Sequence, residues 1–193
     1  MYYFTPFPRV TYDPTGKSVP VLAYDITKRF KLSYIMKNSR LVFYEYAIKD
    51  RDRPDIMAEV YYENSQLDWI FFLTNSIWDP YFQWPLTQLQ FESYIRSKYG
   101  STSNALAQVH HYEQIVVPRK EMFVNFDGTE INIEEKTVVV DQTTYLSLPS
   151  NRRKVIDCLT YEENENNRKR NIRILEKAYL PQLLREFKQV FSV

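Results

Sequence analysis

The chain of 193 residues carries 25 lysines and arginines against 24 aspartates and glutamates, a formal charge of +1. This balance gives no overall attraction to nucleic acid or to an anionic membrane, and no stretch approaches the roughly 18 apolar residues of a membrane span. Aromatic residues make up 16% of the chain and only 3 residues are glycine. The aromatic content is typical of protein interfaces, or simply of a tyrosine-rich core and surface. The low glycine content argues against phosphate-binding loops.

Residues 1–40 are predicted to form an extended N-terminal arm rather than an independent domain. Several prolines interrupt this segment, and apolar aromatic residues lie between them, notably Tyr3, Phe4 and Phe7. We expect the arm to lie on a partner, with these three aromatic side chains as tentative anchors. A first strand folded onto the chain's own domain is the alternative. A basic cluster near the end of the arm indicates a solvated face or a contact with an acidic partner, and comprises Lys28, Arg29, Lys31, Lys37 and Arg40.

The N-terminus has no basic stretch followed by a long apolar run, as a secretory signal requires. The single cysteine, Cys158, allows no intramolecular disulfide. We therefore expect the product to stay in the cell that makes it, unless an assembly carries it out.

Residues 41–100 are predicted to form the central unit of the chain. The run 41–48 is rich in β-forming residues and predicts a strand. Asp52 is a candidate N-cap for a first short helix, with Pro54 in the first turn. Ser65 is a candidate N-cap for a second helix, which we expect to end near Asn75.

The second part of the central unit contains turns, aromatic residues and one more helix. Asp79-Pro80 predicts a turn, because the residue before proline is pushed out of the α region. Trp84-Pro85-Leu86 is predicted to be extended, and Trp78, Tyr81 and Trp84 are tentative partner-binding residues. Thr87 then predicts the cap of a helix that ends at Gly100.

Residues 101–193 are predicted to be rich in strands and to end in an amphipathic helix. Ser101–Asn104 is a short linker or a new N-cap. Strands are expected between Ile115 and Leu148, including 137–141 and 143–148. Asp127-Gly128 predicts a hairpin turn, either of a protruding loop or of a small packed sheet.

The terminal helix is predicted to open within 178–182, with Pro181 near its start. Apolar residues recur there at helical spacing, namely Leu183, Leu184, Phe187, Val190 and Phe191. Leu184 and Phe187 on this helix are tentative partner contacts. Arg168 and Arg170 belong to a basic run that directly follows acidic residues. Alternating charge blocks favour an interlocking protein surface over nucleic-acid binding, so both arginines are also tentative partner contacts.

Catalytic and metal sites find little support in the sequence. His110 and His111 are the only histidines, and adjacent residues of an extended segment point to opposite faces, so they are unsuited to one metal ion. Cys158 lies in an apolar, strand-like context, where a thiol is more often packed than reactive. No hydrolase, metalloprotease, nucleotide-binding or dinucleotide-binding motif occurs. We expect no catalytic residue, metal or cofactor.

Two separated parts of the chain resemble one protein family. Two short helices, an asparagine and then Asp-Pro are similar to the middle of a LysM domain. More narrowly, the central unit resembles the small baseplate wedge subunit of T-even-type contractile-tail bacteriophages through Arg53-Pro54-Asp55, Leu67-Asp68-Trp69, Asn75, Asp79-Pro80 and Trp84-Pro85-Leu86. The run YEENENNRKRNIRIL at 161–175 and the helix after it resemble the tail of the same subunit.

The resemblance implies an α+β fold with a central LysM-like unit. It also implies a structural protein that joins neighbouring wedges into the sixfold baseplate around the hub. Its partners would be other wedge proteins, with no nucleic acid, membrane or small-molecule substrate, in the virion and in the host cytoplasm during assembly. Two alternatives remain: a glycan-binding LysM module, which the added helix after Leu86 makes less suitable, and an accessory domain of a wall-degrading enzyme.

Overall fold

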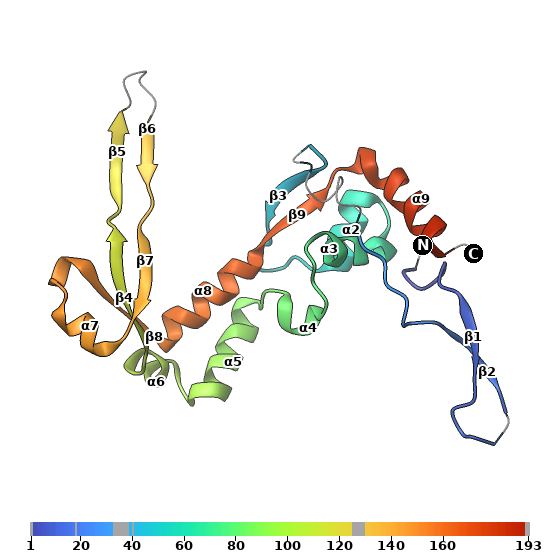
Figure 1. Cartoon of the computed structure of the whole chain (residues 1–193), viewed down its shortest axis with the longest axis horizontal. Helices are drawn as coiled ribbons and strands as arrows, with labels where there is room; N and C mark the ends of the chain where they lie inside the picture. The colour runs from blue at the N-terminus through green and yellow to red at the C-terminus, as the bar shows by residue number, and fades with distance from the viewer. Residues whose placement is uncertain (1, 18, 33–38, 40, 125–129, 192–193) are drawn as a thin grey trace. The chain divides into compact units, whose positions relative to one another are not determined.

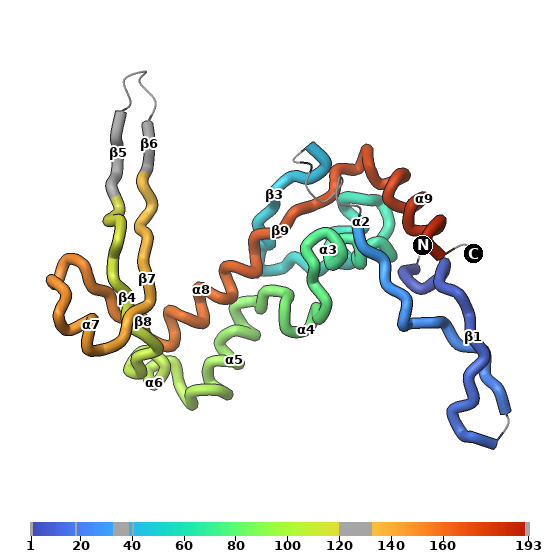
Figure 2. Tube along the Cα trace, in the orientation of Figure 1, coloured from blue at the N-terminus to red at the C-terminus, as the bar shows by residue number. Residues whose placement is uncertain are grey.

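The computed structural model describes residues 2–17, 19–32, 39, 41–124 and 130–191 (Figure 1). Of residues 120–124 and 130–132 only the backbone is described, and they are drawn in grey in Figure 2. Helices alternate with several small antiparallel sheets. The fold is therefore α+β, as the sequence predicts.

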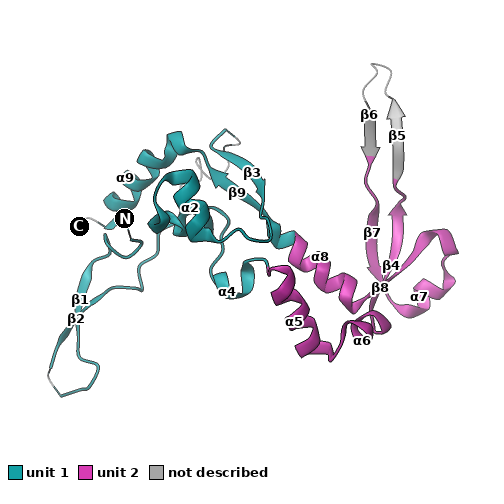
Figure 3. Cartoon of the chain, turned by 180° about the vertical axis from the view of Figure 1, so that it is seen from behind, with its two compact units in different colours: residues 1–85, 168–193 teal, residues 86–167 magenta. Residues whose placement is uncertain are grey.

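Contacts divide the chain into two compact units (Figure 3). Unit 1 contains residues 1–85 and 168–193, and unit 2 contains residues 86–167. Unit 1 thus combines the two ends of the chain, and unit 2 is a single continuous stretch between them. The division into segments 1–40, 41–100 and 101–193 stays a prediction.

Unit 1 is built on a two-stranded ribbon whose strands are far apart in sequence. Strand β3 (Phe43–Ala47) pairs antiparallel with β9 (Asn171–Leu175), and the strand at 41–48 is thereby confirmed. Helix α2 (Pro54–Tyr62), the 3₁₀ turn η1 (Ser65–Leu67) and α3 (Trp69–Thr74) follow β3. The order within this part of the unit is β–α–α–β, with unit 2 inserted before the second strand.

The two predicted helices are present, but other residues cap them. Pro54 occupies the first turn of α2, and the N-cap is Arg53 rather than Asp52. The Asp52 carboxylate instead accepts hydrogen bonds from the Lys49 backbone N–H (2.7 Å) and the Tyr46 hydroxyl (2.8 Å). It thereby holds the loop between β3 and α2.

The second helix is preceded by a 3₁₀ turn, which is absent from the prediction. Asn64, not Ser65, caps that turn by accepting from the Gln66 backbone N–H, and Asp68 caps α3. Asn75 ends α3 as predicted.

The predicted turn at Asp79-Pro80 is in fact the start of a short helix, α4 (Pro80–Gln83). Asp79 accepts a hydrogen bond from the Tyr81 backbone N–H. Pro80 occupies the first turn, where backbone N–H groups have no acceptor within the helix, so the N–H that proline lacks costs no hydrogen bond. Trp84 then leaves the helix in an extended conformation, as predicted.

The C-terminal helix α9 (Leu180–Phe191) follows the 3₁₀ turn η3 (Lys177–Tyr179) and covers the core of unit 1. Its stripe at i, i+4 spacing is confirmed, since Leu183, Phe187 and Phe191 are buried, whereas Val190 is exposed. The core of unit 1 also contains buried aliphatic and aromatic residues from the arm, from α2 and α3 and from β9, among them Phe7, Phe30, Ala58, Ile70, Phe71, Ile172, Ile174 and Leu175.

The N-terminal segment folds in part onto the chain's own domain, and its contact with a partner stays a prediction. Phe7 and Phe30 are buried in unit 1, with the Phe7 ring stacked on that of Phe191 at 4.1 Å between centroids. Between them the chain forms a hairpin of β1 (Arg9–Tyr12) and β2 (Val21–Tyr24), which extends away from the helices of this unit (Figure 1). Phe7 and Phe30 thus fold onto the chain itself, and the apolar residues of the hairpin between them are exposed.

The helical part of unit 2 contains α5 (Gln88–Tyr99), α6 (Thr102–Ala107) and α8 (Cys158–Arg170), the last of which leads the chain back to unit 1. The predicted caps are confirmed: Thr87 forms a reciprocal capping box with Gln90, and Gly100 ends α5 at a φ of 82°. Ser101 is a new N-cap, which decides between the two predicted roles of 101–104. Phe91, Ile95 and Ala105 form a small core between α5 and α6, and Leu159 of α8 packs against it.

The sheet of unit 2 has the strand order β7 (Lys136–Val140), β4 (Val109–Val117), β8 (Arg153–Asp157). Beyond it the chain forms a second antiparallel pair, β5 (Lys120–Val124) with β6 (Glu130–Ile133). This pairing confirms a hairpin at the predicted place, while the turn residues Asp127 and Gly128 lie outside the described residues.

Two expectations for unit 2 are wrong. Residues 143–148 were expected to be a strand, but α7 (Gln142–Ser147) forms there, followed by the 3₁₀ turn η2 (Ser150–Arg152). The Asp141 carboxylate accepts from the backbone N–H groups of Thr143 and Thr144, and this cap favours a helix over the β-propensity of the two threonines. Cys158 is buried, but it begins α8 instead of lying within a strand.

Candidate binding surfaces

Asn75 joins the end of α3 to the ribbon of unit 1. Its side-chain amide donates to the Arg173 carbonyl (2.9 Å), and its side-chain oxygen accepts from the Arg173 N–H (2.7 Å). The amide also donates to the Phe71 carbonyl at 2.8 Å. One side chain thereby satisfies both outward backbone groups of a β9 residue, as a neighbouring strand would do.

Asn166 makes the same kind of contact in unit 2. Its side-chain oxygen accepts from the Leu86 N–H (2.7 Å), and its amide donates to the Leu86 carbonyl (3.1 Å). Asn166 is buried on α8, so this pair fixes the segment that leads into α5. Both asparagines are therefore structural residues.

Glu162 is a buried carboxylate at the centre of a charge cluster in unit 2. Its carboxylate accepts hydrogen bonds from Lys98 (2.6 Å), Tyr99 (2.9 Å) and Tyr94 (3.2 Å), all on α5. Burial by itself would raise the pKa of Glu162, but the hydrogen bonds from Lys98 and Tyr99 outweigh it and hold the pKa below its ordinary value.

The pKa values of Lys98 and Tyr99 are shifted in the opposite direction. The hydrogen bond to Glu162 raises the pKa of Lys98. Burial, followed by the hydrogen bond to Glu162, raises the pKa of Tyr99 to about 12. These shifts keep Glu162 ionised, Lys98 charged and Tyr99 neutral near neutral pH. The cluster is therefore suited to an ion pair between α8 and α5 and not to acid–base chemistry at that pH.

An exposed aromatic cluster surrounds the short helix α4. Trp78, Tyr81 and Phe82 are 61%, 83% and 68% exposed, and we call these three residues the aromatic knuckle. Gln83 holds it in shape, because its side-chain oxygen accepts from the backbone N–H groups of Trp78 (2.7 Å) and Asp79 (2.9 Å).

Two cations border the aromatic knuckle. The Arg29 guanidinium lies 5.7 Å from the Trp78 ring centre, and the Lys169 ammonium donates to the Phe82 carbonyl at 2.9 Å. Large aromatic side chains with arginine beside them are typical of the centres of protein interfaces. The aromatic knuckle therefore has the composition that is typical of a protein-binding surface.

The β1–β2 hairpin is a second exposed apolar surface of unit 1. Its residues Val10, Tyr12, Val21, Leu22 and Tyr24 are between 40% and 61% exposed. A two-stranded hairpin is marginally stable alone, and exposed apolar patches mark interaction sites.

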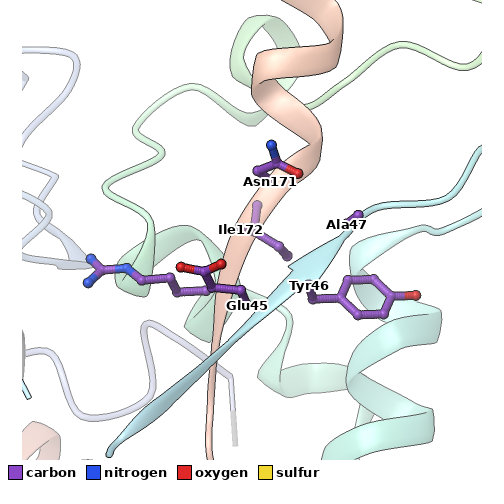
Figure 4. Close-up of a pocket in the computed structure, with 6 residues that line it drawn as sticks. Glu45, Tyr46, Ala47, Asn171 and Ile172 are labelled. Atoms are coloured by element: carbon purple, nitrogen blue, oxygen red, sulfur yellow. The ribbon is translucent and has the colours of Figure 1, made fainter. Parts of the chain in front are cut away.

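A cavity of about 530 Å³ lies along the ribbon of unit 1 (Figure 4) and is lined by Glu45, Tyr46, Ala47, Asn171, Ile172 and Arg173. Glu45 and Tyr46 point to opposite sides of β3, as neighbours in a strand do. The Tyr46 hydroxyl is engaged by Asp52, and burial raises its pKa. The lining therefore offers a pair of opposite charges but no nucleophile beside a base.

The two histidines lie closer together than predicted. The Nδ1 atoms of His110 and His111 are 2.7 Å apart, and His110 stacks on Tyr161. The expectation of opposite faces is wrong because the pairing register between β4 and β8 shifts between Val109 and His111, and such an irregularity re-aims a side chain. Within the described ranges, no three His, Cys, Asp or Glu side chains are grouped to hold a metal ion. Over the same part of the chain, no helix has the length and hydropathy of a membrane span.

The ten tentative partner residues fall into three groups. Trp78, Tyr81, Phe4 and Arg168 are exposed. Tyr3, Trp84, Arg170 and Leu184 are half-buried, and Arg170 lies 3.5 Å from the Asp50 carboxylate. Phe7 and Phe187 are buried in the core of unit 1, where their side chains pack against the chain itself. Their role in partner binding stays a prediction.

Sequence reasoning missed some exposed apolar residues. Phe82 belongs to the aromatic knuckle, and its position next to Tyr81 could have indicated it. The apolar residues of the β1–β2 hairpin were grouped with the arm as a whole. Val138 and Val139 were expected in a strand, but nothing in their sequence shows that this strand lies at the edge of a sheet.

Exposed aromatic surfaces on an α+β chain, together with polar clusters that serve internal contacts, are typical of proteins that bind other proteins. The chain belongs to the base plate wedge protein 53 family, whose model matches residues 2–190. No curated protein matches the chain. The family assigns a structural role in the phage tail baseplate, a location in the virion tail and contacts with other baseplate proteins.

Proposed function

We propose that this chain joins neighbouring wedges into the sixfold baseplate around the hub during tail assembly in the host cytoplasm. The observation that carries the proposal is the aromatic knuckle, whose three side chains are more than half exposed and whose backbone at Trp78 and Asp79 donates to the Gln83 side chain. Anchors of this kind supply most of the binding free energy of an interface, while neutral net charge contributes little.

The presence of several separate exposed surfaces supports a joining role rather than a single contact. Unit 1 carries both the aromatic knuckle and the β1–β2 hairpin. A protein that links two neighbours needs at least two such surfaces, one for each neighbour. We propose no catalytic role and no nucleic-acid, membrane or small-molecule partner.

We further propose that unit 1 is LysM-like and serves assembly instead of glycan binding. The β3–α2–α3–β9 order and the ribbon pairing support the first part. The second part is supported by Asn75, whose polar groups are taken up by backbone groups of its own unit. Calorimetric titration with a chito-oligosaccharide is expected to show no binding, and a saturable heat would favour the glycan-binding alternative.

The decisive experiment is electron microscopy of wedge complexes purified without this protein and then mixed with it. Closed six-membered rings are expected only after mixing. Wedges that stay separate with this chain unbound would contradict the joining role.

A matched pair of variants connects this role to the aromatic knuckle. The double variant Trp78→Ala, Tyr81→Ala is expected to fold normally, because both side chains are exposed. Its yield of closed rings is expected to fall on the order of tenfold. Val60→Ala is the control, since Val60 is 79% exposed on α2 of the same unit. Equal ring yields for both proteins would exclude the aromatic knuckle from the contact.

A further inference from the structure

Strand β7 forms an outer edge of the sheet in unit 2. It pairs with β4 through the register Tyr112↔Val140 to Ile115↔Thr137, and β4 separates it from β8. In the described part of the chain, no backbone hydrogen bond other than this pairing involves residues 136–140. Alternate residues of an edge strand direct their N–H and C=O groups away from the sheet, so β7 carries a row of open donors and acceptors.

The last three residues of β7, 138–140, are all valines and place apolar side chains on both faces of the sheet. Val138 is 55% exposed and Val139 is 64% exposed, and neighbouring strand residues point to opposite faces. Helix α7 packs on one face through Tyr145, whose ring lies 4.6 Å from that of Tyr112, and it leaves Val138 exposed.

The usual protection of an exposed edge is missing between Thr137 and Val140. Natural edge strands carry charged residues, prolines or bulges that prevent pairing with other chains, and this stretch contains no charge and no proline. Its β-branched residues also have high strand propensity. An edge of this composition is suited to pairing with a further strand.

We propose that β7 is extended by a strand from another wedge protein, so that the three-stranded sheet gains a fourth strand in the assembled wedge. The occupant is an extended segment with apolar side chains on both faces, and it presents a carboxylate opposite Lys136. The other end of β7 needs no cation, because Asp141 already caps α7 with its carboxylate. The choice of a wedge protein as the source rests on the proposed function.

A second copy of this chain is the less suitable occupant. Antiparallel self-pairing of β7 would set Lys136 against Asp141, but that carboxylate already accepts from the Thr143 and Thr144 N–H groups and from the Thr144 hydroxyl. Self-pairing also produces a twofold contact, whereas neighbours in a cyclic ring meet through two different surfaces. The geometry therefore favours a strand of different sequence.

The test is hydrogen exchange of the full-length chain, alone and in the wedge complex formed from the other wedge proteins. The open N–H groups between Thr137 and Val140 are expected to exchange quickly in the free protein and to be protected in the complex. In parallel, Val138→Lys with Val139→Lys is expected to lower incorporation into the wedge on the order of tenfold. Leu146→Lys is the control, since Leu146 is 64% exposed on α7 of the same unit.

The outcomes separate this inference from the proposed function. Normal incorporation with unprotected β7 amides overturns the inference and leaves the joining role intact. Protection that grows with the concentration of the free protein overturns it in favour of self-pairing. Protection of β7 in single wedges that never close into rings supports the inference and contradicts the joining role.

Discussion

At the scale of single residues, two asparagines hold together segments that are distant in sequence. Asn75 and Arg173 are 98 positions apart, and Leu86 and Asn166 are 80 apart. An asparagine side chain carries a donor and an acceptor in the arrangement of a peptide group, so it can satisfy both backbone groups of one residue. Neither partner could be found from the sequence, because each contact depends on how the chain returns to the same place.

Replacement of Asn75 is expected to destabilise unit 1. Asn75→Ala removes the bonds to Arg173 and Phe71 and leaves partly buried backbone groups without partners, which should lower the free energy of unfolding by about 2 to 4 kcal/mol. Urea unfolding measures the change. Asn171→Ala is the control, because Asn171 is exposed at the start of β9, and equal effects of the two substitutions would contradict the role given to Asn75.

Glu162 should make the stability of unit 2 depend on pH. Its pKa is lower in the folded protein than in the unfolded chain, so the stabilisation is fully present above the unfolded pKa of about 4.3 and is lost as the pH falls through the folded pKa. Glu162→Gln is expected to be less stable at neutral pH and to lose this acid dependence.

Urea unfolding at neutral pH and at several values below about pH 4.3 tests this expectation. Glu163→Gln serves as the control, since Glu163 is an exposed neighbour on α8. A slope of stability against pH that is the same in Glu162→Gln and in the unchanged protein would argue against the cluster as its source.

At the scale of elements, the N-terminal segment contains both core residues and exposed residues. Phe7 is 4% exposed and packs against α9, whereas Tyr12 on β1 is 61% exposed. Both lie in the same apolar, proline-interrupted stretch, so composition alone cannot separate them. The difference arises because α9, from the other end of the chain, covers Phe7 and does not cover the hairpin.

Substitutions in this segment should therefore have separate effects. Phe7→Ala is expected to lower the free energy of unfolding by about 3 to 5 kcal/mol, because it opens a cavity in the core of unit 1. Tyr12→Ala should change stability by less than about 0.5 kcal/mol and reduce assembly into wedges. Thermal unfolding and wedge incorporation measure the two effects, and a stability loss of equal size in both would refute the division.

At the scale of the whole molecule, the two units have separate cores of very different size. Buried residues from the arm, α2, α3, β9 and α9 form the core of unit 1, whereas that of unit 2 centres on Phe91, Ile95 and Ala105. Because stability rises with buried apolar area, unit 2 should be the less stable of the two.

Denaturant unfolding of the whole chain is accordingly expected in two steps, with unit 2 first. Glu162→Gln should move only the first step, and Asn75→Ala only the second. Tryptophan fluorescence reports on unit 1, since all 3 tryptophans lie there, and far-ultraviolet circular dichroism reports on both. A single transition that both substitutions shift together would show that the units unfold as one.

The sequence by itself determined the local elements whose signals are short-range. The Thr87 and Gly100 boundaries of α5, the end of α3 at Asn75, the strand at β3 and the apolar stripe of α9 all depend on neighbouring residues, and the family resemblance was visible in the same stretches. Where two local signals competed, as at Asp141 between a helix cap and β-branched residues, the prediction failed.

Only the tertiary structure decided which strand pairs with which, and hence which surfaces remain free. The partner of β3 is β9, at the other end of the chain, and β7 is an edge because β8 takes the other side of β4. Pairing and burial depend on contacts between residues far apart in sequence, and no local pattern encodes them. For this reason the sequence predicted a protein that binds other proteins, and the structure was needed to separate its exposed surfaces from its core.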